Sequence, residues 1–113
     1  MVNRRRLRAD ECEIVSAMLS GKPACAHLVS NLNASVVEDM QDGGMGSIRF
    51  LSRNEERHPG DTVAEAEYTD EDGVLVIIAL NTDDGGGLYE LDFWKVDFSP
   101  LRRYPSVQEL RIK

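Results

Sequence analysis

Carboxylates are the side chains of this chain whose type and spacing could support chemistry. Glu90 and Asp92 alternate along the segment 88–98, so on a strand their carboxyl groups lie about 6–7 Å apart on one face. Such a pair, with Asp42 as a further acid, could serve as acid and base in hydrolysis. Lys95 falls on the opposite face, and no His or Ser is recognisably placed to assist. We therefore assign no catalytic residue and keep a small carboxylate-based hydrolase, with or without a divalent metal, as the alternative function.

Metal sites are the next candidates, and the spacing of their ligands argues against them. The side chains of zinc-binding type are Cys12, Cys25, His27 and His58. They match no zinc motif, and both cysteines fall on apolar faces of predicted helices. The acidic stretches 69–73 and 81–87 contain only part of a calcium loop and have no flanking helices. The sequence thus predicts neither a metal nor a cofactor.

The stretch QDGGMGS, 41–47, could hold a phosphate or reverse the chain. A phosphate loop needs Lys and Ser or Thr at the start of a helix, and a dinucleotide site also needs a following helix. Here a strand-like apolar segment follows. We predict a tight turn in which glycines take positive φ and Asp42 accepts nearby backbone N–H groups. Met45, an apolar side chain at the tip, is either tucked into the core or shown to a partner.

The clearest indication of function is a strand face that carries both acids and the only Trp of the chain. Trp94 shares its face with Glu90 and Asp92, and Trp is enriched in binding hot spots. Glutamates alternate with apolar residues along 62–70, so they form the wet face of another strand. The candidate binding residues are Asp42, Met45, Glu65, Glu67, Glu90, Asp92 and Trp94. The alternative is a solvated face with Trp94 half-covered by the C-terminal tail.

The charge balance indicates what kind of partner such a face would meet. The chain carries 13 basic and 20 acidic residues, a net charge of −7, although Arg4, Arg5, Arg6 and Arg8 cluster at the N-terminus. An acidic body repels phosphates, so nucleic acid is not an expected partner. Acidic surfaces speed the capture of basic partners. We expect a non-enzymatic protein-binding module, immunity- or inhibitor-like, with a basic protein as partner; a homo-oligomer stays open.

The elements that must position these residues follow from hydrophobic periodicity. Apolar residues recur with a period of about 3.6 over 9–20 and 23–32, which predicts two helices. From residue 34 the period becomes 2, which predicts strands. The predicted strands cover 34–40, 47–52, 62–70, 73–81 and 88–98. Because no helix separates them, the sheet should be antiparallel and largely a meander.

The predicted fold is therefore α+β: an N-terminal helix pair packed on a five-stranded, mainly antiparallel meander sheet. Its 113 residues fit one domain, 1–113, in which residues 1–8 form a basic, partly flexible arm. No run of about 18 apolar residues occurs, so no membrane span is expected. No apolar segment of signal-peptide length follows the basic N-terminus either. We expect a cytoplasmic protein with reduced cysteines.

Two strings of the sequence carry a resemblance to a known family. DGGMGS, 42–47, and LYELDFWKVDFSPLRRYP, 88–105, resemble a small bacterial family known only as a domain of unknown function. The likeness extends over nearly the whole chain, from RRLRADE to YP. Some members of such families resemble immunity proteins of bacterial toxin systems. The resemblance implies no activity and no site residue.

Overall fold

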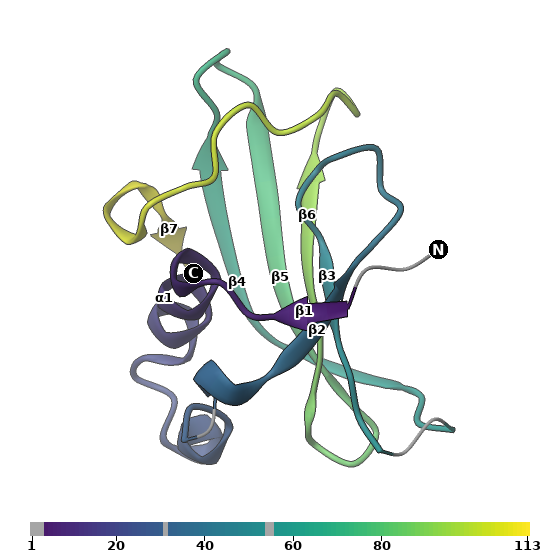
Figure 1. Ribbon diagram of the computed structural model, residues 1–113. Helices are drawn as coiled ribbons and strands as arrows, with labels where there is room; N and C mark the ends of the chain where they lie inside the picture. The colour runs from purple at the N-terminus through teal and green to yellow at the C-terminus, as the bar shows by residue number, and fades with distance from the viewer. Residues whose placement is uncertain (1–3, 31, 54–55) are drawn as a thin grey trace.

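The computed structural model of the protein describes residues 4–30, 32–53 and 56–113 (Figure 1). Its helical elements are α1 (Ala9–Leu19) and the 3-10 helices η1 (Pro23–Leu28), η2 (Leu32–Ala34) and η3 (Val107–Glu109). Its strands are β1 (Arg4–Arg6), β2 (Val36–Asp39), β3 (Ile48–Phe50), β4 (Pro59–Thr69), β5 (Leu75–Asp83), β6 (Leu88–Lys95) and β7 (Arg111–Ile112). They form one sheet in the order β1-β2-β3-β6-β5-β4-β7, and all neighbours are antiparallel.

The α+β class and the antiparallel sheet are confirmed, whereas the predicted five-stranded meander is wrong in detail. Over the described residues the sheet has seven strands, because β1 and β7 add an edge strand on each side. The order is not sequential either, since β3 pairs with β6 rather than with β4. The two missed strands are short and rich in arginine, which suits an edge but leaves no apolar alternation in the sequence.

Part of the predicted N-terminal arm lies in the sheet. Arg4–Arg6 pair with β2 as a strand, while residues 1–3 lie outside the described residues. The guanidinium of Arg5 donates to both oxygens of the buried Glu11, at 2.8 and 2.9 Å, and to Asp39 at 2.7 Å. These hydrogen bonds raise the pKa of Arg5. The arm therefore binds the acidic body of the protein itself.

The predicted helix 9–20 is confirmed as α1, and the second predicted helix, 23–32, is helical in a tighter form. It consists of η1 and then η2, and no residue of η1 is buried. A short segment without a buried stripe lacks the packing that sustains most α-helices. A further helical turn near the C-terminus, η3, follows the last predicted strand. Among the described residues, no helix has the length and apolar character that crossing a membrane requires.

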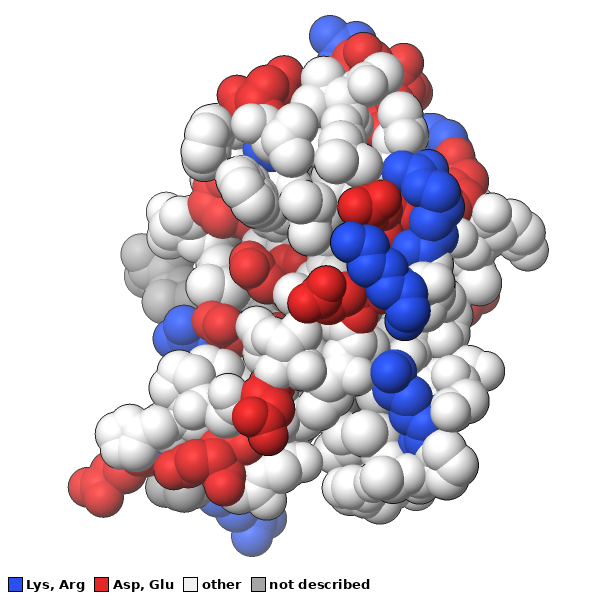
Figure 2. Space-filling model, turned by 180° about the vertical axis from the view of Figure 1, so that it is seen from behind, with Lys and Arg blue, Asp and Glu red and all other residues white. Residues whose placement is uncertain are grey.

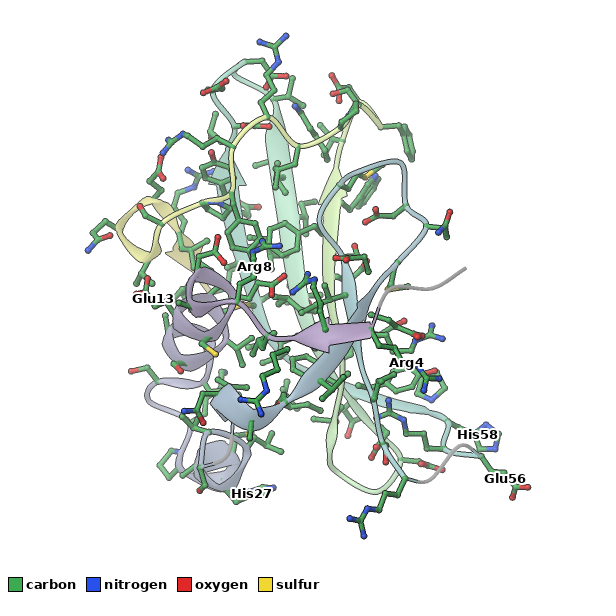
Figure 3. The ribbon with its side chains drawn as sticks, viewed as in Figure 1. Arg4, Arg8, Glu13, His27, Glu56 and His58 are labelled. Atoms are coloured by element: carbon green, nitrogen blue, oxygen red, sulfur yellow. The ribbon has the colours of Figure 1, made fainter. Side chains whose placement is uncertain are left out.

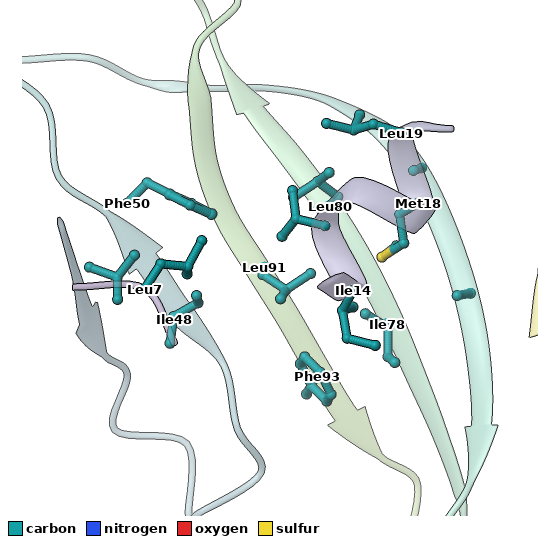
Figure 4. Close-up of a cluster of buried hydrophobic side chains, with 14 of the residues drawn as sticks. Leu7, Ile14, Met18, Leu19, Ile48, Phe50, Ile78, Leu80, Leu91 and Phe93 are labelled. Carbon is teal, nitrogen blue, oxygen red and sulfur yellow. The ribbon is translucent and has the colours of Figure 1, made fainter. Parts of the chain in front are cut away.

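The core lies between one face of the sheet and a cover made by α1 and the C-terminal segment (Figure 1). Ile14 and Met18 of α1 meet Ile78 and Leu80 of β5 there (Figure 4). The opposite face of the sheet, which we call the outer face, is turned to solvent (Figure 2). Its residues alternate with the core residues and include Arg4, Glu38, Arg49, Glu65, Glu67, Ile77, Ala79, Glu90, Asp92 and Trp94.

Candidate functional site

The stretch 40–47 is a turn between β2 and β3, as predicted. Asp42 accepts the backbone N–H of Met45 through Oδ1, at 3.1 Å, and that of Ser47 through Oδ2, at 3.0 Å. Both oxygens of this carboxylate are thus used by the turn. Asp42 is therefore a structural residue of the turn, although it was predicted as a binding residue.

The glycines of this turn are needed for their backbone and for their lack of a side chain. Gly44 and Gly46 have φ values of 81° and 103°, a region that favours glycine. A Cβ atom on Gly44 would lie 3.4 Å from Pro100 Cβ, and one on Gly46 would lie 3.4 Å from Leu101 Cδ2. The backbone N–H of Leu101 also donates to the carbonyl of Gly44, at 3.0 Å. The C-terminal segment therefore packs against this turn.

Side chains of the same turn complete the edge of β6. β3 pairs with β6 at two residue pairs only, and beyond them the turn takes the place of a strand. Ser47 Oγ accepts the backbone N–H of Phe93 at 2.9 Å and donates to Asp92 Oδ1 at 3.1 Å. Met45 Sδ accepts the backbone N–H of Lys95 at 3.4 Å. Met45 is 9% exposed, so this predicted binding residue is tucked in and does not face a partner.

Lys95 is fully buried and holds the far end of β6 to two other segments. Its Nζ donates to Asp70 Oδ2 at 2.9 Å, to Asp72 Oδ2 at 2.6 Å and to the carbonyl of Pro100 at 3.1 Å. Sequence reasoning missed this cluster and considered the stretch 69–73 only as an incomplete calcium loop. The available signal was a lysine in alternation with Leu91 and Phe93 on the core face.

Asp70 is the centre of this buried cluster. It also accepts the backbone N–H groups of Glu71, Arg102 and Arg103, at 2.8, 2.8 and 3.2 Å. Burial acts to raise the pKa of Asp70, but hydrogen bonds from Arg102, Lys95 and Glu71 outweigh it and lower that pKa to about 2. The carboxylate therefore stays charged and ties the β4–β5 turn to the C-terminal segment.

Three apolar side chains project into solvent where β6 ends, and we call Trp94, Val96 and Phe98 the aromatic platform. They are 46%, 40% and 69% exposed. The ring centroids of Trp94 and Phe98 lie 6.3 Å apart. Phe98 has a φ of 63° and is the one non-glycine residue with positive φ within the described ranges. Such a conformation is strained for a phenylalanine, so the chain keeps this ring in water at a cost in free energy.

The register of β4, β5 and β6 brings four of the predicted residues together on the outer face. Glu67 and Trp94 lie on either side of Ile77 in one row across the strands. Glu65 and Asp92 lie on either side of Ala79 in the next row. These glutamates, Asp92 and Trp94 thus form a continuous surface beside the aromatic platform.

Basic side chains neutralise much of the remaining acidic face, which sequence reasoning did not predict. Arg4, Glu38, Arg49 and Glu90 form a row of alternating charge across β1, β2, β3 and β6. Arg49 Nη2 lies 2.7 Å from Glu90 Oε2. At the opposite edge, Glu67 is 3.2 Å from Lys113 Nζ and 3.9 Å from Arg111 Nε. The acidic surface is therefore smaller than the composition suggests.

Glu65 and Asp92 are the outer-face carboxylates without a basic partner among the residues that the structure describes. Partial burial raises the pKa of Asp92, against the hydrogen bond from Ser47, and the nearby Glu90 and Asp42 carboxylates raise it further. A cation beside Asp92 would relieve this repulsion. The arrangement can thus accept positive charge next to an exposed indole.

The hydrolase alternative finds little support in the same geometry. Of the acids named for that function, Asp42 is used by the turn and Glu90 by Arg49, so neither is free to act together with Asp92. Within the described ranges, no group of three His, Cys, Asp or Glu side chains lies close enough to hold a metal ion.

Two hollows of about 290 Å³ each lie at the other end of the sheet and share Arg57 as a lining residue. The guanidinium of Arg57 donates to the backbone carbonyls of Phe50 and Leu88 and to the carboxylate of Asp83. It also lies 4.7 Å from the ring centroid of Tyr89. Arg57 therefore joins the elements around it, and its hydrogen bonds give no indication of a ligand.

Comparison with known proteins identifies a family. The family model described as "Domain of unknown function (DUF6984)" matches residues 4–105. The predicted resemblance to a family of unknown function is thereby confirmed. No curated protein and no solved structure matches the chain. The matched range includes the glycine turn, β6 and the segment after it, which the structure joins around the aromatic platform.

Proposed function

We propose that this chain, which belongs to the DUF6984 family of unknown function, is a non-enzymatic protein-binding module. Its docking surface is the aromatic platform together with Glu65 and Asp92 of the outer face. Phe98 carries the proposal, because its ring is 69% exposed on a backbone with a φ of 63°. A left-handed backbone costs a residue with a side chain roughly 1–2 kcal/mol, and a largely exposed ring contributes little burial. Neither feature helps the fold, whereas both suit a ring held ready for a partner.

Trp94 supports the proposal as a rigid anchor. It lies on a strand whose next residue, Lys95, is fixed by a buried ion cluster, and whose edge is closed by Ser47 and Met45. Anchors that are rigid before binding lose little conformational entropy when the partner arrives. Trp residues at such positions are frequent hot spots.

The charge of the surface supports a basic partner. The chain carries a net charge of −7, and the outer-face acids beside Trp94 that lack a basic partner among the described residues are Glu65 and Asp92. Complementary charge raises association rates and suppresses acidic competitors. An acidic inhibitor or immunity protein is one kind of protein with these properties.

Site-specific crosslinking tests the proposal. A photoreactive amino acid replaces Val96 in the platform, and in a control it replaces Glu13, which projects from α1 (Figure 3). We expect a protein from a lysate of the source organism to be crosslinked from position 96 and not from position 13. Trp94→Ala or Phe98→Asn should abolish that adduct. The absence of any adduct from position 96, or an adduct that neither substitution weakens, would contradict the proposal.

A further inference from the structure

We infer that the docking surface receives an arginine side chain of the partner, which lies over the indole of Trp94 and forms a salt bridge with Asp92. This inference rests on the proposed function and deepens it by naming the chemical group that the partner supplies.

The protein already contains one arginine that contacts both an aromatic ring and an acid of β6. The guanidinium of Arg49 lies 5.2 Å from the ring centroid of Tyr89 and bonds to the carboxylate of Glu90 at 2.7 Å. An aromatic ring and an acid of β6 thus share one arginine, which the neighbouring strand β3 supplies. Asp92 and Trp94 also bring an acid and an aromatic ring of β6 close together, although they are two residues apart whereas Tyr89 and Glu90 are adjacent.

Asp92 and Trp94 receive no arginine from β3, because that strand begins at Ile48, which pairs with Leu91, and does not extend beside Asp92. Beside Asp92, the neighbouring segment offers the short side chain of Ser47, whose hydroxyl reaches one carboxylate oxygen only. On the other side, Asp92 faces Ala79 of β5, and the next acid in that row is Glu65. Because the Ala79 side chain is small, it projects little above the sheet between the two carboxylates. No basic side chain of the described residues pairs with either of them.

Arginine fits this place better than lysine for geometric reasons. Asp92 and Trp94 lie two residues apart on one strand face, about 6–7 Å. A planar guanidinium can stack on an indole and still present paired N–H donors to a carboxylate beside it. The ammonium of lysine is a compact point charge that cannot make both contacts in the same way.

Intrinsic fluorescence tests the inference, because Trp94 is the only Trp in the chain. The probes are tri-arginine, tri-lysine and the neutral isostere tri-citrulline, each titrated into the full chain at constant ionic strength. We expect tri-arginine to change the Trp94 emission in a saturable way, with tri-lysine binding about fivefold more weakly and tri-citrulline giving no change. Equal responses to tri-arginine and tri-lysine, or no response to either, would overturn the inference.

Substitution at Asp92 provides a second test of the inference. Asp92→Asn removes the charge but keeps an acceptor for the Ser47 hydroxyl, so we expect it to fold and to bind tri-arginine about tenfold more weakly. Glu13→Gln removes the same charge from α1 and should leave binding unchanged. Equal binding by Asp92→Asn and the wild type would refute the arginine contact. A partner that still crosslinks from position 96, in a way that depends on Trp94 and Phe98, would then keep the proposed function, so the two failures are distinguishable.

Discussion

Phe98 has a backbone conformation that asparagine adopts more readily than phenylalanine does. We expect Phe98→Asn to leave the free energy of unfolding unchanged or to raise it by up to about 1 kcal/mol, because relief of the strained φ offsets the lost contact with Trp94. Urea unfolding measures the change. The buried Phe93 is the matched control, and Phe93→Asn should cost about 3 kcal/mol or more. A loss of more than about 1 kcal/mol for Phe98→Asn would mean that the ring serves the fold.

Asp70 links the stability of the protein to pH. Its pKa falls from an ordinary 3.8 to about 2 in the folded chain, so its contribution is present above about pH 4 and is lost as the pH falls toward 2. Asp70→Asn removes one partner of the buried Lys95, a change that costs about 3–5 kcal/mol in buried ion pairs. We expect thermal melts of the variant to show a lower melting temperature at pH 7 and a flatter pH dependence between about pH 4 and 2. Asp84→Asn, in an exposed turn, is the control, and an equal loss in it would refute this role.

At the scale of elements, substitutions at two glycines of the turn 40–47 test how closely the C-terminal segment packs on it. Gly43→Ala and Gly46→Ala both place a Cβ at a positive φ, 76° and 103°, which costs about 1–2 kcal/mol each. Only the Cβ at Gly46 would contact the next layer, 3.4 Å from Leu101, whereas nothing lies within 4 Å at Gly43. We therefore expect Gly46→Ala to be the more destabilising variant in urea unfolding. An equal loss of unfolding free energy in the two variants would mean that the C-terminal segment does not pack closely on the turn.

Elements with strong periodicity could be predicted from the sequence, whereas those defined by tertiary pairing could not. α1, β5 and β6 carry apolar patterns of the helical or strand period, so their positions were correct within a few residues. β1 and β7 carry arginines and depend on the strands beside them for their structure. The placement of β3 next to β6 was also beyond reach, because pairing between distant strands leaves no local signal.

The same limit applies to the candidate site. Alternation placed Asp92 and Trp94 on one face, which the structure shows as well. Only the register between strands reveals that Arg49 neutralises Glu90 and that Lys113 neutralises Glu67. Phe98 was missed because a positive φ at an aromatic residue has no signature in the sequence.

Over the whole molecule, 20 acidic and 13 basic residues give a net charge of −7, and the structure distributes the excess acids unevenly. Arginines and lysines pair with acids along β1–β3 and along the edge formed by β4 and β7. Figure 2 shows basic side chains gathered along one edge of the molecule. Glu65 and Asp92 lie between these two regions. The field of the molecule should therefore direct a basic partner toward the surface beside Trp94.

Association kinetics with the partner captured at position 96 test this steering. We expect the association rate to fall about tenfold or more between about 50 and 500 mM salt, because screening shortens the range of the attraction. Glu65→Gln and Glu13→Gln change the net charge equally, but only Glu65 lies on the outer face, so only Glu65→Gln should slow association. Stopped-flow fluorescence of Trp94 measures both rates. Equal slowing by the two variants would mean that net charge alone steers the partner, and a rate independent of salt would mean that the partner is not basic.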